Sequence, residues 1–156
     1  MSGKMNARIP PDFVLLACGI LIWLPARYLV GFSFSFSGQG LFAGIAIVAG
    51  LGIIFWANGT LTRHRTTGHP GRHTLAEATC LVTDGPYRFS RNPIYLGMVM
   101  LLIGWLLLWS NWLGIVIIAA FMLFITKFQI IAEEKALESV FHSAYLAYKS
   151  RVRRWV

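Results

Sequence analysis

Four long apolar segments dominate this sequence and limit what the chain can fold into. A helix needs roughly 20 apolar residues to cross the hydrocarbon core of a bilayer, and four segments approach that length: residues 13–30, 41–57, 94–109 and 113–131. Of the 156 residues, 56% are hydrophobic and only 13% are charged, which is too few charges for the surface of a water-soluble domain. The sequence therefore predicts an all-α integral membrane protein with four transmembrane helices.

Basic residues lie in alternate loops between these segments. Lys4 and Arg8 precede the first segment, five arginines lie between the second and the third, and most remaining lysines and arginines follow the fourth. The turn at Ser110 and Asn111 carries no charge. By the positive-inside rule, we expect both termini and the long middle loop to face the cytoplasm from the inner or cytoplasmic membrane. Because the net charge of +8 is spread over several loops, it does not indicate a nucleic-acid partner.

The third and fourth apolar segments are expected to form a helical hairpin around the short turn at Ser110 and Asn111. Beyond residue 131 the helical period continues, with Leu137, Phe141 and Tyr148 on one apolar stripe. This pattern predicts a C-terminal amphipathic helix. It would either lie along the membrane surface or fold back over the middle loop.

The segment DGPYRFSRNPIYLG, residues 84–97, places polar residues directly before the third apolar segment. Asn92 suits the N-cap of a helix and Pro93 its first turn, so a helix is predicted to begin here. The free N–H groups of that turn, with Arg88 and Arg91 upstream, favour a carboxylate or phosphate. The alternative is that the arginines meet lipid phosphates at the interface.

Glu133 and Glu134 lie where the fourth apolar segment ends. An acid at this position needs a partner, and the candidates are Arg88, Arg91 or a cationic ligand. A purely structural ion pair is the alternative interpretation.

Other kinds of site are disfavoured by residue type and spacing. His64, His69, His73 and Cys80 match no common zinc pattern, so we expect no metal ion. The centres of the four apolar segments contain no ionisable residue, which argues against a proton-coupled transporter. They also contain no histidine that could ligate a haem.

Three blocks of the sequence, in this order, resemble the isoprenylcysteine carboxyl methyltransferase and phospholipid methyltransferase superfamily. They are Gly59-Thr60, residues 81–97 and residues 133–152. The resemblance implies a single membrane methyltransferase domain over residues 1–156, with cytoplasmic cofactor-binding segments at 59–97 and 132–156. It also implies S-adenosylmethionine as cofactor and a lipophilic or membrane-embedded acceptor, with membrane lipid as the surrounding partner.

The same resemblance implies which residues form the cofactor site. They are Gly59, Thr60, Leu81, Val82, Gly85, Tyr87, Arg91, Asn92, Pro93, Tyr95, Gly97, Glu133, Glu134, Tyr145, Tyr148 and Arg151. Asn92 stands where the family often has histidine, and this difference weakens the expectation of a prenylcysteine substrate.

Arg91 and Glu134 are the expected catalytic residues. Arg91 would orient a carboxylate acceptor, whereas an amine or a thiol acceptor would need a base, for which Glu134 is the candidate. Which of Glu133 and Glu134 contacts the cofactor stays open. Two alternatives also stay open: a non-catalytic lipid-binding protein with this fold and, with less support, a small transporter.

Overall fold

The computed structural model describes residues 9–64 and 80–156 of the chain. Its elements, in chain order, are α1 (Pro11–Tyr28), η1 (Val30–Phe32), α2 (Gln39–Arg63), η3 (Gly85–Arg88), α3 (Pro93–Trp109), α4 (Leu113–Ile125), the π-helix η4 (Thr126–Ile130) and α5 (Ile131–Arg151). This architecture confirms the predicted all-α fold. The middle of the predicted cytoplasmic loop, including His69 and His73, lies outside the described residues.

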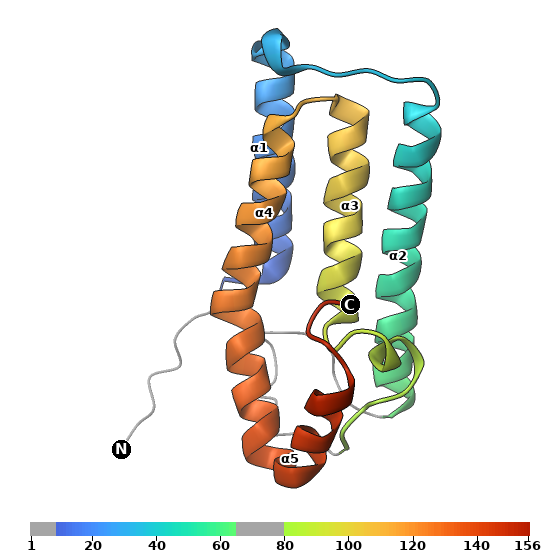
Figure 1. Ribbon diagram of the computed structural model, residues 1–156, viewed down its shortest axis with the longest axis vertical. Helices are drawn as coiled ribbons and strands as arrows, with labels where there is room; N and C mark the ends of the chain where they lie inside the picture. The colour runs from blue at the N-terminus through green and yellow to red at the C-terminus, as the bar shows by residue number, and fades with distance from the viewer. Residues whose placement is uncertain (1–8, 65–79) are drawn as a thin grey trace.

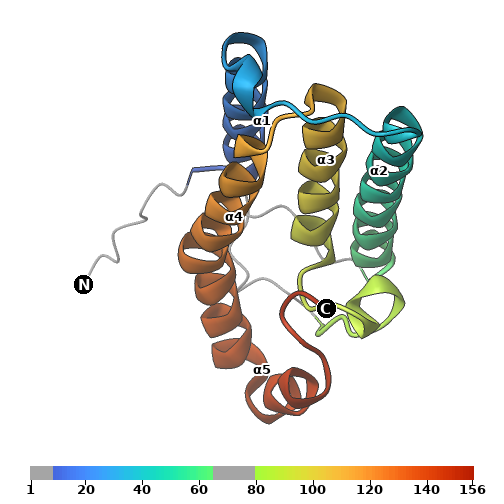
Figure 2. The ribbon, with the colours of Figure 1, turned by 45° about the horizontal axis from the view of Figure 1, so that its top comes forward.

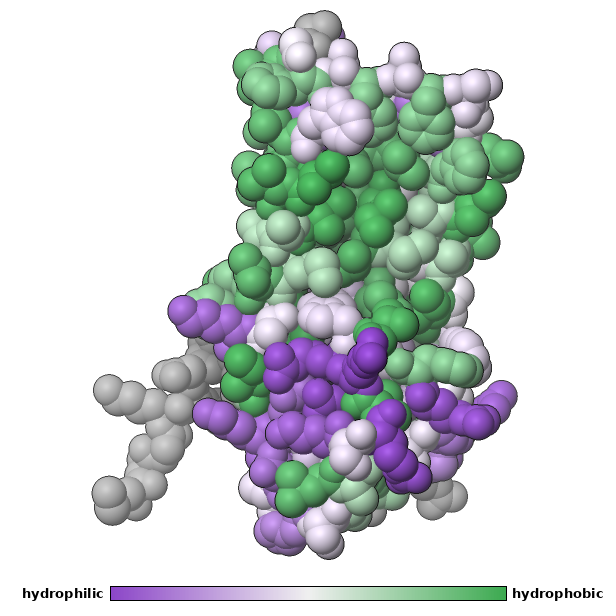
Figure 3. All heavy atoms as spheres, viewed as in Figure 1, coloured by the Kyte–Doolittle hydropathy of each residue, from purple (hydrophilic) through white to green (hydrophobic). Residues whose placement is uncertain are grey.

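The helices form a bundle in which α3 stands between α2 and α4, and α1 lies behind α4 (Figure 1). Within the described residues, three helices are long and apolar enough to cross a membrane: α1, α2 and the continuous helix Leu113–Arg151. Helix α3 is also apolar but has only 17 residues, as the sequence predicted for a short third span. Hydrophobic side chains cover the bundle, and hydrophilic ones gather at the end where α5 lies (Figure 3).

The closest helix contact is between α2 and α3, and glycines make it possible. A Cβ atom added at Gly97 would lie 2.7 Å from the carbonyl oxygen of Gly50, and one at Gly104 would lie 3.0 Å from that of Ala43. Small residues of this kind let two backbones approach each other in lipid. The contact fixes the position of α3, which begins directly after the polar residues of segment 84–92.

A π-helix joins α4 to α5 and was not predicted from the sequence. Gln129 and Ile130 in this turn are buried, and the Gln129 side chain donates a hydrogen bond to the carbonyl oxygen of Ile9, 2.7 Å away. An extra residue in a helical turn changes which face of the downstream helix meets its neighbours. Here the downstream face that carries Glu134 meets the start of α3.

Helix α5 bends sharply at His142, which has φ 44° and ψ −118°. The second half of α5 therefore turns back, and the chain returns toward the start of α3 (Figure 2). Val152 is extended and ends the helix. Of the two predicted arrangements for the amphipathic helix, the structure shows the one that folds back.

Candidate functional site

The start of α3 is held by the C-terminal residues rather than by its own cap. Helix α3 begins at Pro93 with Asn92 at the N-cap position, as predicted, but the Asn92 side chain makes no capping hydrogen bond. Its amide nitrogen instead donates to the carbonyl oxygen of Arg154 at 2.9 Å. The carbonyl is available because residues 152–156 run beside the turn.

We call residues 152–156 the C-terminal strap. The backbone N–H of Arg91 donates to the carbonyl oxygen of Arg153 at 3.0 Å, and the Ser90 hydroxyl donates to that of Arg154 at 3.3 Å. Trp155 packs against the apolar core of the bundle. The backbone carbonyl groups of the strap therefore hold it against residues 90–92, directly before α3.

Glu134 forms the centre of an ionic cluster between α3, α5 and the strap. Arg154 donates to both carboxylate oxygens, Nε to Oε1 at 2.9 Å and Nη2 to Oε2 at 2.8 Å. Arg91 contacts only one oxygen, with 3.2 Å between Nη2 and Oε1. Arg91 was among the predicted partners, whereas Arg154 was missed and the other candidate, Arg88, is exposed. The run of basic residues directly after Tyr148 was the sequence signal that could have indicated Arg154.

The two arginines control the ionisation of Glu134. Burial on its own would raise the pKa of this carboxyl group, but the hydrogen bonds from Arg154 and the charge of Arg91 outweigh burial and lower it. The same hydrogen bonds raise the pKa of the Arg154 guanidinium. Glu134 is therefore an anion at neutral pH and a weak proton acceptor in this arrangement.

Arg91 has an unused hydrogen-bond donor. Its side chain is only 9% exposed, and its Nη1 reaches the hydroxyl of Tyr145 at 3.4 Å. Its Nε is buried without a partner among the described residues. A buried donor without an acceptor is costly and rare in proteins, so this Nε is a candidate donor for a ligand oxygen.

Of the predicted tyrosines, Tyr145 contacts Arg91 directly, whereas Tyr95 and Tyr148 bond to neighbouring residues. The Tyr95 hydroxyl donates to Oε1 of Glu133 at 2.6 Å, and the Tyr148 hydroxyl donates to the carbonyl oxygen of Tyr87 at 2.7 Å. The rings of Tyr145 and Tyr148 lie 6.2 Å apart at an angle of 60°. Burial raises the pKa of both Tyr145 and Tyr148, so both hydroxyls stay protonated at neutral pH. The Tyr145 hydroxyl accepts from Arg91, whereas the Tyr148 hydroxyl donates.

The remaining predicted site residues lie further from the cluster. Gly85, with φ 56°, sits against α2, where an added Cβ would be 2.7 Å from Oγ1 of Thr60. Val82 and Tyr87 pack against that same end of α2, with Leu81 half-buried beside them. Gly97 lies in the α2–α3 contact described above. The structure therefore uses these residues to fix the loop and α3 rather than to contact the arginines.

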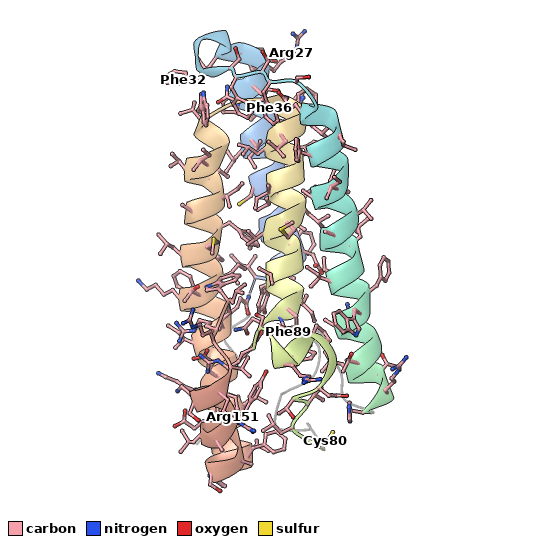
Figure 4. All side chains as sticks on the ribbon, turned by 45° about the vertical axis from the view of Figure 1, so that its right-hand side comes forward. Arg27, Phe32, Phe36, Cys80, Phe89 and Arg151 are labelled. Atoms are coloured by element: carbon pink, nitrogen blue, oxygen red, sulfur yellow. The ribbon has the colours of Figure 1, made fainter. Side chains whose placement is uncertain are left out.

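Two predicted residues lie on the surface. Gly59 faces open space, and no atom would come within 4 Å of an added Cβ. Arg151 is exposed near the end of α5, where its Nε donates to the carbonyl oxygen of Ala147 at 3.2 Å (Figure 4). The cluster therefore contains Arg154, three residues after Arg151, and not Arg151 itself.

A groove of about 600 Å³ lies on the inner side of the bent helix α5 and reaches the Glu134–Arg154 pair. Its lining residues are Ile131, Glu134, Lys135, Glu138, Ser139, Lys149 and Arg154. Small-molecule sites have volumes of roughly 300–1,000 Å³. The groove therefore gives a ligand of that size access to one side of the ionic cluster.

The histidine and cysteine pattern of the middle loop is only partly described. His64 pairs with Asp84 at 3.0 Å, and the Cys80 thiol donates to the carbonyl oxygen of His64 at 3.5 Å. Within residues 9–64 and 80–156, no group of three or more His, Cys, Asp or Glu side chains is placed to hold a metal ion.

An apolar helical bundle with a polar cluster at one end fits an integral membrane protein. The model of the phospholipid methyltransferase family matches residues 38–144, which is more than half of the chain. The chain belongs to this family, and the family indicates methyltransferase activity. An uncharacterised protein of Haemophilus influenzae is 44% identical over 66 residues, which cover 40% of this chain and all of that protein. The family match ends before Tyr145, so the strap lies beyond it.

Proposed function

We propose that this protein transfers a methyl group from S-adenosylmethionine to a lipophilic acceptor that reaches the site from the membrane. The observation that carries this proposal is the buried, unpartnered Nε of Arg91 beside Glu134. The family supports methyl transfer in general, and the cluster supports a ligand that carries an anionic group. The position of the cluster at the end of an apolar bundle favours a lipophilic acceptor.

The residues of the cluster fit the chemistry of the cofactor. S-adenosylmethionine carries a carboxylate, an ammonium group, ribose hydroxyls and a cationic sulfonium centre. Arg91 offers a donor for the carboxylate, and Glu133 and Glu134 offer acceptors for the ammonium and hydroxyl groups. The tyrosine rings offer aromatic faces that attract cations. Donors, acceptors and aromatic faces therefore occur together around this cluster.

When bound, S-adenosylmethionine supplies an electrophilic methyl group whose bond to sulfur breaks as the acceptor attacks. The protein residues bind and orient the reactants. Arg91 holds a carboxylate, either that of the cofactor or that of the acceptor, and Glu134 holds Arg91. Much of the rate enhancement in such a displacement comes from alignment.

The lowered pKa of Glu134 favours one class of acceptor. An attacking amine or thiol must lose a proton, and an ionised carboxylate held by two arginines is a weak base. An attacking carboxylate has no proton to lose and forms a methyl ester directly. We therefore propose a carboxylate acceptor. An amine or thiol product would require another base.

Calorimetry with S-adenosylmethionine and the purified protein in detergent tests the proposed function. We expect saturable binding by the wild-type protein. The Arg91→Gln variant separates the two possible carboxylates. Weaker cofactor binding would assign Arg91 to the cofactor, and unchanged binding with lost methyl transfer would assign it to the acceptor. If the wild-type protein bound a lipid but no cofactor, the non-catalytic alternative would replace this proposal.

A further inference from the structure

Arg91 and Arg154 compete for the same buried carboxylate, and they do so unequally. Arg154 engages both oxygens of Glu134 with its planar fork, at 2.9 and 2.8 Å. Arg91 has a single contact with Oε1, at 3.2 Å, and keeps its Nε free of any described partner. Paired N–H···O bonds between a guanidinium and a carboxylate are stronger and more directional than a single one. The outcome of this competition decides which arginine has donors left for a ligand.

We propose that Arg154 is a positioning residue that keeps Arg91 available to a bound carboxylate. Arg154 occupies both oxygens of Glu134. It therefore prevents Arg91 from forming a bidentate pair with that carboxylate. The proposal rests on the proposed function, because the carboxylate that Arg91 receives belongs to the cofactor or to the acceptor. It assigns a role to a residue outside the region that the family model matches.

The buried setting of Glu134 gives the physical reason. Its side chain is only 9% exposed, so the loss of one partner leaves a charge that water cannot solvate. Arg91 is the other cation already in contact with it, and Nε is its unused donor. Without Arg154, a rotation of Arg91 that places Nε and Nη2 on the two oxygens would restore the lost hydrogen bonds. The same rotation would consume the donor that the ligand needs.

The Arg154 side chain can be changed without releasing the strap from residues 90–92. The carbonyl oxygen of Arg154 accepts hydrogen bonds from Asn92 and Ser90, and Arg153 accepts one from the Arg91 backbone. None of these contacts uses the Arg154 guanidinium. Arg154→Gln should therefore keep the strap in place while it removes the competition for Glu134.

Cofactor affinity, kcat and KM for the acceptor form the first test, measured for the wild type, Arg154→Gln, Glu134→Gln and the double variant Glu134→Gln/Arg154→Gln. We expect Arg154→Gln to weaken carboxylate binding by about tenfold, the cost of one charged hydrogen bond. The loss appears in cofactor affinity if Arg91 binds the cofactor, and in the KM of the acceptor if it binds the acceptor. The double variant should bind within about threefold of Glu134→Gln alone, because without the Glu134 carboxylate the loss of Arg154 no longer draws Arg91 away.

Arg153→Gln is the matched control, because it removes the same charge from the same strap while its side chain is exposed. It should behave as the wild type. A merely structural role for Arg154 would weaken binding by the same factor with and without Glu134, and that result would overturn the proposal. An unchanged affinity and KM in Arg154→Gln would overturn it as well.

A second test needs no cofactor and so separates this proposal from the proposed function. If either arginine alone can neutralise Glu134, then Arg91→Gln/Arg154→Gln should lower the free energy of unfolding by more than the sum of the two single variants. Chemical unfolding in detergent measures this double-mutant cycle. Additive losses would show that Arg91 does not replace Arg154, even if the protein binds S-adenosylmethionine.

Discussion

Glu134 shows how the environment of a single residue defines the site. It lies just beyond an apolar span, yet two arginines from distant parts of the chain contact its carboxylate. Burial would favour the neutral acid, but the hydrogen bonds from Arg154 and the charge of Arg91 favour the anion more strongly. The charge of this residue is therefore part of the folded structure and should appear in its stability.

Glu134 should make the protein sensitive to acid. Its pKa in the folded protein is below the ordinary value of 4.5, so its contribution to stability is complete above that pH and is lost as the pH falls through the lower folded value. Thermal unfolding in detergent from about pH 3 to 7 should show a loss of Tm below about pH 4.5 that is smaller in Glu134→Gln.

Glu138→Gln is the control for this titration. Its side chain is 42% exposed and contacts Lys149 at 3.4 Å, so its ion pair is screened by water. This variant should lose as much Tm as the wild type when the pH falls. If Glu134→Gln also lost as much Tm as the wild type, Glu134 would not be the source of the acid sensitivity.

At the scale of the elements, the sequence predicted helices better than their connections. The apolar segments and the Asn92-Pro93 helix start were visible because span length and helix-start residues have clear physical signals. The bend at His142 and the π-helix before α5 had no glycine or proline to mark them. Because the bend brings Arg154 to Glu134, the sequence could suggest Arg91 as a partner but not Arg154.

The α2–α3 contact should be sensitive to a single methyl group. In Gly97→Ala the new Cβ would lie 2.6 Å from Cγ1 of Ile54 and 2.7 Å from the carbonyl oxygen of Gly50, so the two helices must move apart. We expect a loss of about 1–3 kcal/mol in the free energy of unfolding. Gly44→Ala on α2 is the control, since no atom lies within 4 Å of its added Cβ. Equal stability of the two variants would contradict the close contact.

The bend in α5 should be more stable with glycine at its centre. His142 is exposed and has φ 44° with ψ −118°, a conformation that costs a residue with a Cβ about 1–3 kcal/mol. His142→Gly should therefore raise the free energy of unfolding, measured by chemical unfolding. Ser143→Gly, at the neighbouring exposed position, should lower it by about 1 kcal/mol. A loss of stability in both variants would show that His142 is not strained.

At the scale of the whole molecule, the site lies at one end of an apolar bundle. The Gln129–Ile9 hydrogen bond brings the start of α1 to the end of α4, and the strap lies at that same end. The distribution of basic residues predicts that this end is cytoplasmic.

Cysteine variants at Arg153 and at Ser35, in the α1–α2 connection, test this orientation. In intact cells, a membrane-impermeant thiol reagent should label the Ser35 variant and spare the Arg153 variant, and the reverse pattern would contradict it.

We propose that the cluster around Arg91 and Glu134 supports methyl transfer at the membrane. The most direct test of this proposal is the transfer of a labelled methyl group from S-adenosylmethionine into the lipid extract of cells, with the purified protein in vesicles and products identified by mass spectrometry. We predict a lipid-soluble methyl ester that forms with the wild type and Arg153→Gln, and that is lost or strongly reduced with Arg91→Gln. No labelled product with the wild type, or an equal yield with Arg91→Gln, would contradict the account.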